Sequence, residues 1–343
     1  MKDYYLFLTF YSPFRNNLPI SVSNKPDVPS IDKITTILNF MSQEFDAVHL
    51  LGGEPFILPF FNDILDFAVD HYSKVYVETM GTGDVFRAAY NIRRHIKDGA
   101  DIEVLVQLLD MDPAVADKYV GNGSWESAIS SASLLKATFD IDPKIVMYIG
   151  SHSTHKYRLL ADLGFELILR RAYGMKVTER SVANMFQLAE YGQVTVEDCV
   201  LSAIKGGAPC VEPKYVLDFD GNIYLSRYYI TDELKIGNVF GMTFDDLTNT
   251  VETAYQKLQQ VKLVGKCSRC AYAEVCMGGD FLFWPSLEQA NDQACPVHEE
   301  AVVEINEETE EQAPEQIEDE DLVSSEDAGE FITEDEFIES LDE

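Results

Sequence analysis

The feature that most constrains the fold of this chain is a regular alternation of short apolar runs with amphipathic stretches over its first half. The runs are apolar nearly throughout, as strands of a parallel sheet buried on both faces are. An amphipathic stretch follows each of the first five, which is typical of βα units. The predicted strands are residues 4–10, 47–51, 74–79, 102–109, 144–149 and 165–169. Six units are too few for a closed eight-stranded barrel, so the pattern predicts an open, partial α/β barrel.

The stretches between these strands place apolar residues on one helical face, which predicts amphipathic helices. Ser30 and Asp84 stand at N-cap positions, where a side-chain oxygen accepts a hydrogen bond from the first turn. A further helix over 175–200 is expected to connect the barrel to the rest of the chain. The predicted helices between strands are residues 30–45, 60–71, 84–96, 124–137 and 155–163.

Beyond residue 201 the sequence changes character. Asp220-Gly221-Asn222 separates two apolar runs and predicts a β-hairpin over 215–225. A helix over 244–261 and a cysteine-rich, loop-like segment follow. The chain therefore divides into four predicted parts: a partial barrel over 1–175, a connector helix over 176–200, a small domain over 201–298 and an acidic tail over 299–343.

The negative charge is concentrated at the C-terminal end. The 343 residues include 59 acidic and 26 basic ones, and the tail over 299–343 carries 21 of the acidic residues with no Lys or Arg. The remaining chain, with 26 basic against 38 acidic residues, has a net charge of −12. Such a chain repels phosphate backbones, so we expect no nucleic-acid partner. The tail is predicted to be disordered and to attract a basic partner, if it has one.

The chain has no apolar run that approaches the ~20 residues of a membrane span. Its N-terminus also lacks the basic region and apolar core of a secretory signal. We therefore expect a cytoplasmic protein without membrane contact.

Four of the six cysteines have the spacing of a metal site. Two residues separate Cys267 from Cys270, five more precede Cys276, and eighteen more precede Cys295. A pair at this spacing binds one metal from a tight turn, and two further thiolates complete four soft ligands. Four thiolates suit both zinc and a [4Fe–4S] cluster, so the spacing leaves both open.

This cysteine pattern resembles the SPASM domain, the C-terminal auxiliary-cluster module of many radical SAM enzymes. The resemblance implies that Cys267, Cys270, Cys276 and Cys295 hold one [4Fe–4S] cluster, as the outer cluster's ligands do in the family. An inner cluster would use the positions that here hold Cys199, Cys210, Ser226 and Asp280. Because two of these four are not thiols, we expect the inner cluster to be lost. Cys199 and Cys210 would then be ordinary small apolar residues.

A second motif directly follows the second predicted strand. Gly52-Gly53-Glu54-Pro55 is similar to the GGEP motif of radical SAM enzymes, in which the backbone and the Glu hold the amino group of S-adenosylmethionine. With the SPASM-like pattern, the resemblance covers essentially residues 1–298. It implies a partial (β/α)6 TIM-like barrel of the radical SAM type, followed by a small SPASM-type domain.

The resemblance breaks at the family's defining feature. In radical SAM enzymes a C-x3-C-x2-C loop after the first strand ligates the [4Fe–4S] cluster that cleaves S-adenosylmethionine. Here these positions hold Ser12, Asn16 and Pro19, and no cysteine precedes Cys199. Two neighbouring motifs have drifted to Thr79-Met80-Gly81 and Leu108-Leu109-Asp110-Met111. We therefore expect no cleavage of S-adenosylmethionine and a vestigial role for residues 52–55.

Polar residues at the mouth of the predicted barrel offer a different site. Each of them follows or ends a predicted strand: Glu54, Asp110, His152, His155 and Arg170. An enzyme of another class would use such residues for acid–base or anion-binding chemistry. The alternatives are capping or surface histidines and a salt bridge from Arg170 to the barrel rim.

Three functions follow from these patterns. The favoured one is a degenerate radical SAM/SPASM protein that keeps one auxiliary cluster. It would bind a peptide, a protein or an active radical SAM paralogue, or pass electrons, during peptide or protein modification. The second is an enzyme of another class at the barrel mouth, and the third is a scaffold with zinc at the four cysteines.

Overall fold

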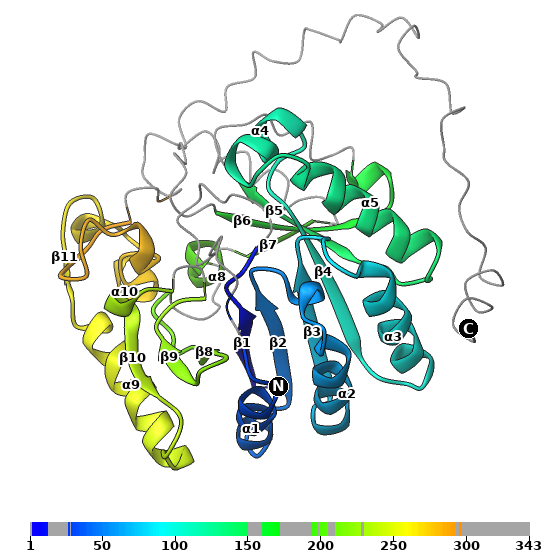
Figure 1. The fold of residues 1–343 in the computed structure, drawn as a ribbon. Helices are drawn as coiled ribbons and strands as arrows, with labels where there is room; N and C mark the ends of the chain where they lie inside the picture. The colour runs from blue at the N-terminus through cyan, green and yellow to red at the C-terminus, as the bar shows by residue number, and fades with distance from the viewer. Residues whose placement is uncertain are drawn as a thin grey trace, which may run out of the picture. The chain divides into compact units, whose positions relative to one another are not determined.

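The computed structural model describes residues 2–12, 27, 29–149, 160–171, 194–197, 199–204, 210–227, 230–292 and 295. All of them fall within one compact unit, Met1–Val302. Ten strands of the described chain form one sheet, in the order β10-β9-β8-β1-β2-β3-β4-β5-β6-β7 (Figure 1). The sheet ends at β10 on one side and at β7 on the other, so it is open, as the sequence predicts.

Seven neighbouring strands of this sheet run parallel. They are β1 (Asp3–Thr9), β2 (Ala47–Gly52), β3 (Lys74–Thr79), β4 (Ile102–Leu108), β5 (Lys144–Ile149), β6 (Glu166–Arg171) and β7 (Val194–Glu197). The first six confirm the predicted strands, with ends shifted by one or two residues. Five helices connect β1 to β5: α1 (Ile31–Met41), α2 (Phe61–His71), α3 (Val85–Lys97), α4 (Pro113–Tyr119) and α5 (Ser124–Ala137).

The main core lies between the outer face of the sheet and these helices. Alternate residues of each strand, such as Leu6, Leu50 and Val77, are fully buried against helical residues such as Ile34 and Leu65. The inner face carries two smaller apolar clusters, one around Leu105, Val146 and Ile168 and one around Phe7 and Leu51, together with charged residues. Lys74, Glu103, Lys144 and Glu166 form a ladder of ion pairs across β3 to β6, with N···O distances of 3.2 to 3.4 Å.

The second half of the chain extends the same sheet beyond β1. The predicted hairpin is present as β8 (Val216–Asp218) and β9 (Asn222–Tyr224), and β8 pairs parallel with β1. The Asp218 carboxylate accepts hydrogen bonds from the backbone N–H groups of Asp220 and Asn222, both at 2.9 Å, which holds the turn. The edge strand β10 (Lys235–Asn238) then leads into α9 (Phe244–Gln259), close to the predicted helix.

Short elements make up the rest of the described chain. They are η1 (Pro55–Ile57), α8 (Cys199–Ile204), η2 (Asp232–Leu234), β11 (Lys262–Leu263), η3 (Cys267–Arg269), α10 (Ala273–Cys276), η4 (Phe281–Phe283) and β12 (Gln289–Ala290). Strands β11 and β12 pair parallel and enclose most of the cysteine-rich segment between them in sequence.

Three expectations need correction. Residues 194–197, predicted within a connecting helix, form β7, because the β-branched Val194, Thr195 and Val196 pair with β6. Ser30 occupies the N-cap position of α1, but its side chain accepts no hydrogen bond there. The helix α4 was not predicted, although Asp112 at its N-cap and Pro113 at its first position are helix-start signals. The rest of the predicted connector, residues 175–193 and 198, lies outside the described residues, and Cys199 and Val200 begin α8.

No helix in the described part of the chain is long and apolar enough to cross a membrane. The predicted acidic tail, residues 299–343, lies outside the described residues, so its disorder stays a prediction from composition.

Candidate functional site

The glycine turn, residues 52–55, follows β2 where the end of β1 passes very close. A Cβ on Gly52 would lie 2.2 Å from the Thr9 carbonyl oxygen, and one on Gly53 would lie 2.0 Å from the Tyr11 carbonyl oxygen. Gly52 also has a φ of +146°, which side chains rarely adopt. The Gly53 N–H donates to the Thr9 carbonyl oxygen at 2.8 Å. Both glycines are therefore required by the close approach of two strand ends.

The Glu54 carboxylate connects the ends of β2 and β3. It is fully buried and accepts hydrogen bonds from the backbone N–H groups of Phe56 and Met80, both at 2.9 Å, and from the Thr79 hydroxyl at 2.8 Å. Burial raises the pKa of Glu54 to about 6, although these hydrogen bonds favour the charged form. Both carboxylate oxygens accept hydrogen bonds, so the main role of Glu54 in this structure is to connect the ends of β2 and β3. Pro55 begins the short turn η1 that continues from it.

Ser12, at the first position of the missing cysteine motif, makes a buried contact within the protein. Ser12 is 1% exposed, and its hydroxyl donates to the thioether sulfur of Met80, which is also buried, at 3.5 Å. Beside Met80 lies a small cavity of about 20 Å³, lined at the strand ends by Leu108, Leu109 and Tyr148 and closed by residues of α4 and α5. The other two positions, Asn16 and Pro19, lie outside the described residues.

A buried ion-pair network occupies the inner face of the sheet near the same strand ends. Arg170 donates to Glu78 and to Glu197, both at 2.7 Å, and Arg227 donates to Glu197 at 2.8 Å. Gln107 donates to Glu78 at 2.6 Å. Burial works to raise the pKa of Glu78, but the charges of Arg170 and Arg227 hold it below its ordinary value. Arg170 therefore makes salt bridges, as the alternative interpretation of the sequence had it.

The mouth residues that the structure describes, Glu54, Asp110 and Arg170, make different contacts. Glu54 and Arg170 belong to separate hydrogen-bond networks, and the buried Asp110 accepts from the backbone N–H of Asp112 at 2.7 Å. His152 and His155 lie outside the described residues. Sequence analysis missed the network of Glu78, Glu197 and Arg227. The available signal was a charged residue inside an otherwise apolar strand, which is seldom tolerated without a partner.

The four cysteines with metal-site spacing come from one segment of the chain. None of the four is in a disulfide; Cys267, Cys276 and Cys295 are buried, whereas Cys270 is partly exposed. Cys267 and Cys270 flank the turn η3, and Cys276 ends α10. Burial raises the pKa of the Cys276 thiol to about 11, and it also raises that of Cys267.

The chemistry of this donor set fits a thiophilic metal, because four cysteines outside any disulfide lie within residues 267–295. The geometry does not yet form a cage. Among the described residues, no three His, Cys, Asp or Glu side chains are arranged to hold a metal ion. The assignment of a cluster to these cysteines stays a prediction.

Cys199 and Cys210 are not the separate apolar residues expected from the sequence. The structure joins them in a disulfide, because α8 holds Cys199 with its Cα 4.7 Å from that of Cys210. The Cys210 sulfur lies 3.9 Å from that of Cys276, and α8 packs against α10. The other two inner-cluster positions also have structural surroundings: Ser226 is buried, and Asp280 caps η4 by accepting from the backbone N–H of Leu282 at 3.0 Å.

Comparison with known proteins points to maturases. The chain is 24% identical over 258 residues to the mycofactocin maturase MftC of Mycobacterium ulcerans, covering 68% of this chain and 69% of that protein. A stretch of 66 residues, 19% of this chain and 18% of the relative, is 27% identical to a cysteine-type anaerobic sulfatase-maturating enzyme of Clostridium perfringens. No protein-family model matches the chain.

Solved structures share the fold at low sequence identity. Streptococcus suis SuiB bound to S-adenosylmethionine matches with a TM-score of 0.66 and 13% identity, over 85% of this chain and 76% of that one. SuiB bound to its precursor peptide SuiA matches with a TM-score of 0.65 and 14% identity, over 85% of this chain and 75% of that one. The anSMEcpe structure with bound AdoMet and Kp18Cys peptide matches with a TM-score of 0.63 and 14% identity, over 83% of this chain and 90% of that one. The fold is thus that of these proteins, and the relationships support the resemblance to radical SAM/SPASM proteins.

Proposed function

We propose that this chain is a radical SAM/SPASM-like protein that does not cleave S-adenosylmethionine and acts as a binding partner in peptide or protein modification. In this proposal Cys267, Cys270, Cys276 and Cys295 hold one [4Fe–4S] cluster. Residues 1–175 form the barrel-like part, and residues 201–298 form the part that carries the cluster.

The observation that carries the proposal is the distribution of cysteines. No cysteine precedes Cys199, so the loop after β1 offers no thiolate to the cluster that cleaves S-adenosylmethionine in the family. The buried contact between Ser12 and Met80 supports this, because it places a hydroxyl and a thioether where the family has its first ligand and a polar motif. The glycine turn then remains as a vestigial cofactor motif whose Glu54 supports the ends of two strands.

A peptide or protein partner is proposed from the relatives. The relative that matches over 258 residues is a maturase, and two of the solved structures compared above hold a peptide. A chain that keeps such a fold without the ligands for cleavage is suited to present or bind a peptide beside an active enzyme. An active radical SAM paralogue or a short precursor peptide encoded next to this chain would agree with this part of the proposal. Failure of the chain to bind either product when co-expressed would contradict it.

The cluster is tested by anaerobic reconstitution followed by iron and sulfide analysis. One cubane on four thiolates should give about four irons per chain. Eight or more irons would contradict a single cluster. One zinc without sulfide would instead assign the chain to the zinc-stabilised scaffold class, since four thiolates also bind zinc.

A further inference from the structure

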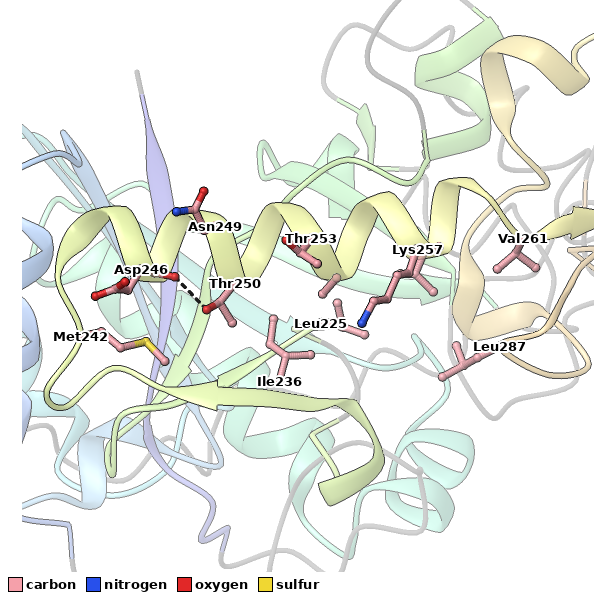
Figure 2. Close-up of a pocket in the computed structure, with 12 residues that line it drawn as sticks. Leu225, Ile236, Met242, Asp246, Asn249, Thr250, Thr253, Lys257, Val261 and Leu287 are labelled. Carbon is pink, nitrogen blue, oxygen red and sulfur yellow. Dashed lines mark hydrogen bonds between the residues drawn. The ribbon is translucent and has the colours of Figure 1, made fainter.

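A cavity lies between helix α9 and strand β10, far from the glycine turn in sequence. It is an open groove of about 970 Å³. Figure 2 shows α9 along one side, with Ile236 of β10 on the opposite side and Leu225 between them. One helical stripe faces the groove: Asp246, Thr250, Thr253, Lys257 and, just beyond α9, Val261.

The groove exists because the residues of α9 that line its middle are small. Thr250, Thr253 and Ala254 leave space along this side of the helix. The opposite side of α9 is anchored by the buried Leu247, Val251 and Tyr255. The helix is therefore held firmly while the groove stays open.

Strand β10 is the last strand of the sheet on this side, so one edge of its backbone has no strand partner among the described residues. An edge strand beside a helix is the arrangement in which proteins take up an extended peptide as an additional strand. The added backbone completes the hydrogen bonds of the edge, and its alternate side chains enter the groove. Aqueous exposure of this edge is compatible with a transient partner.

The charges at the two ends of the groove define the direction of such a peptide. Asp246 lies at one end and Lys257 at the other, as Figure 2 shows, and Lys257 makes no ion pair with a described residue. Eleven helical residues separate them, which corresponds to ~16 Å or about five residues of extended chain. Because β10 runs opposite to α9, a peptide antiparallel to β10 would begin near Asp246 and end near Lys257.

We propose that this groove binds an extended peptide of about five residues that adds to β10, with a basic side chain first, an apolar one in the middle and an acidic one last. The middle side chain would pack against Ile236 beside Thr250 and Thr253. The proposal rests on the proposed function only in taking the partner to be a peptide.

The test uses a fluorescein-labelled heptapeptide with the sequence Gly-Lys-Thr-Leu-Thr-Glu-Gly and a control in which Lys and Glu are exchanged. Fluorescence anisotropy with the full, iron-loaded chain should show the first peptide binding about fivefold more tightly, because exchange turns two attractions into two repulsions. Lys257→Glu should weaken that preference strongly, whereas Lys262→Glu, an exposed lysine of β11 outside the groove, should keep it. Hydrogen exchange of residues 235–238 should slow when the first peptide binds.

A second pair of variants tests the groove itself. Thr253→Trp fills it from an exposed position and should weaken binding about tenfold, whereas Glu252→Trp, the neighbouring exposed position outside the groove, should not. Equal binding of both peptides, unchanged binding by Thr253→Trp, or no saturation below about 1 mM would overturn the proposal. Self-association that buries β10 would assign the groove to a second copy and overturn it as well. Formation of 5′-deoxyadenosine would contradict the proposed function but leave these binding results standing.

Discussion

The glycine turn and the cysteine segment, residues 267–295, carry the two motifs that this chain shares with radical SAM/SPASM proteins, and the structure treats them in opposite ways. At the glycine turn the contacts lie within the protein: the glycines fit against the end of β1, and Glu54 accepts hydrogen bonds from Phe56, Thr79, Met80 and Thr82. In the cysteine segment four cysteines outside any disulfide have metal-site spacing, and the described residues form no metal cage. Under the proposed function the first region keeps its backbone without its chemistry, whereas the second keeps four ligands that a metal would complete.

The largest expected effect comes from the cysteine segment. Replacing Cys267 and Cys270 together by Ala should abolish iron binding and lower the melting temperature of the reconstituted protein, because metal binding supplies folding free energy. Iron analysis and thermal unfolding with and without iron measure both effects. The matched control is Cys199→Ser/Cys210→Ser, which removes the disulfide but should keep about four irons. Loss of iron in this control would mean that all six cysteines serve one site, and the division between outer and inner ligands would be wrong.

The next largest effect is expected at the glycine turn. Gly53→Ala would place a Cβ against the Tyr11 carbonyl oxygen, which is backbone and cannot move aside cheaply. We expect a loss of roughly 3 kcal/mol in the free energy of unfolding, with iron per folded chain unchanged. Gly123→Ala is the control, since nothing lies within 4 Å of its added Cβ and only its positive φ opposes the change. Similar losses in both variants, by urea denaturation, would remove the close approach as the explanation.

Glu54 gives a smaller effect that depends on pH. Its folded-state pKa of about 6 lies above the ordinary 4.5, so the folded chain holds the proton more tightly than the unfolded chain does. Its contribution to stability is therefore greatest below pH 4.5 and falls by about 2 kcal/mol as the pH rises through 6. In Glu54→Gln this slope should disappear. The variant should also lose about 1–3 kcal/mol, because the amide NH2 would face a backbone N–H.

Urea denaturation at pH 4.5, 5, 6 and 7 measures the slope, and Glu252→Gln, an exposed position on α9, is the matched control. An unchanged slope in Glu54→Gln would mean that another group titrates in this range.

The smallest effect is expected from the acidic tail. Deleting residues 305–343 removes a segment rich in like charges with few apolar residues to bury, so the melting temperature and iron content should not change. A clear loss of stability in the truncated protein would show that the tail docks on the rest of the chain.

The sequence predicted the parts of the fold that depend on local pattern. Apolar runs such as residues 145–149 marked the parallel strands, and Asp220-Gly221-Asn222 marked the hairpin. Strand β7 was missed because its pairing with β6 is a long-range contact, whereas residues 175–200 were interpreted as a helix from local pattern alone. The partners in the network around Arg170 were missed because Glu78 lies far away in sequence. The disulfide of Cys199 was missed because Cys199 and Cys210 were both interpreted as separate apolar residues.

The residues of the candidate site could be identified from the sequence, but their arrangement in space could not. The glycines could be named because their motif is contiguous. The reason for them, the close approach of the end of β1, which leaves an added Cβ on Gly52 only 2.2 Å from the Thr9 carbonyl oxygen, required the structure. The cysteines could be named from their spacing, but spacing does not fix how their sulfur atoms converge, because a metal contributes to that arrangement.

The most direct test of the account is a search for cleavage of S-adenosylmethionine. Anaerobically reconstituted, dithionite-reduced protein is incubated with S-adenosylmethionine, and 5′-deoxyadenosine is quantified beside an active anaerobic sulfatase-maturating enzyme and the Cys267→Ala/Cys270→Ala variant. Cleavage needs an iron with an open coordination position, and four thiolates on an auxiliary cluster leave none. We predict no 5′-deoxyadenosine above the level of the double variant. Product above that level, with the active enzyme as reference, would contradict the central claim and identify the chain as a radical SAM enzyme.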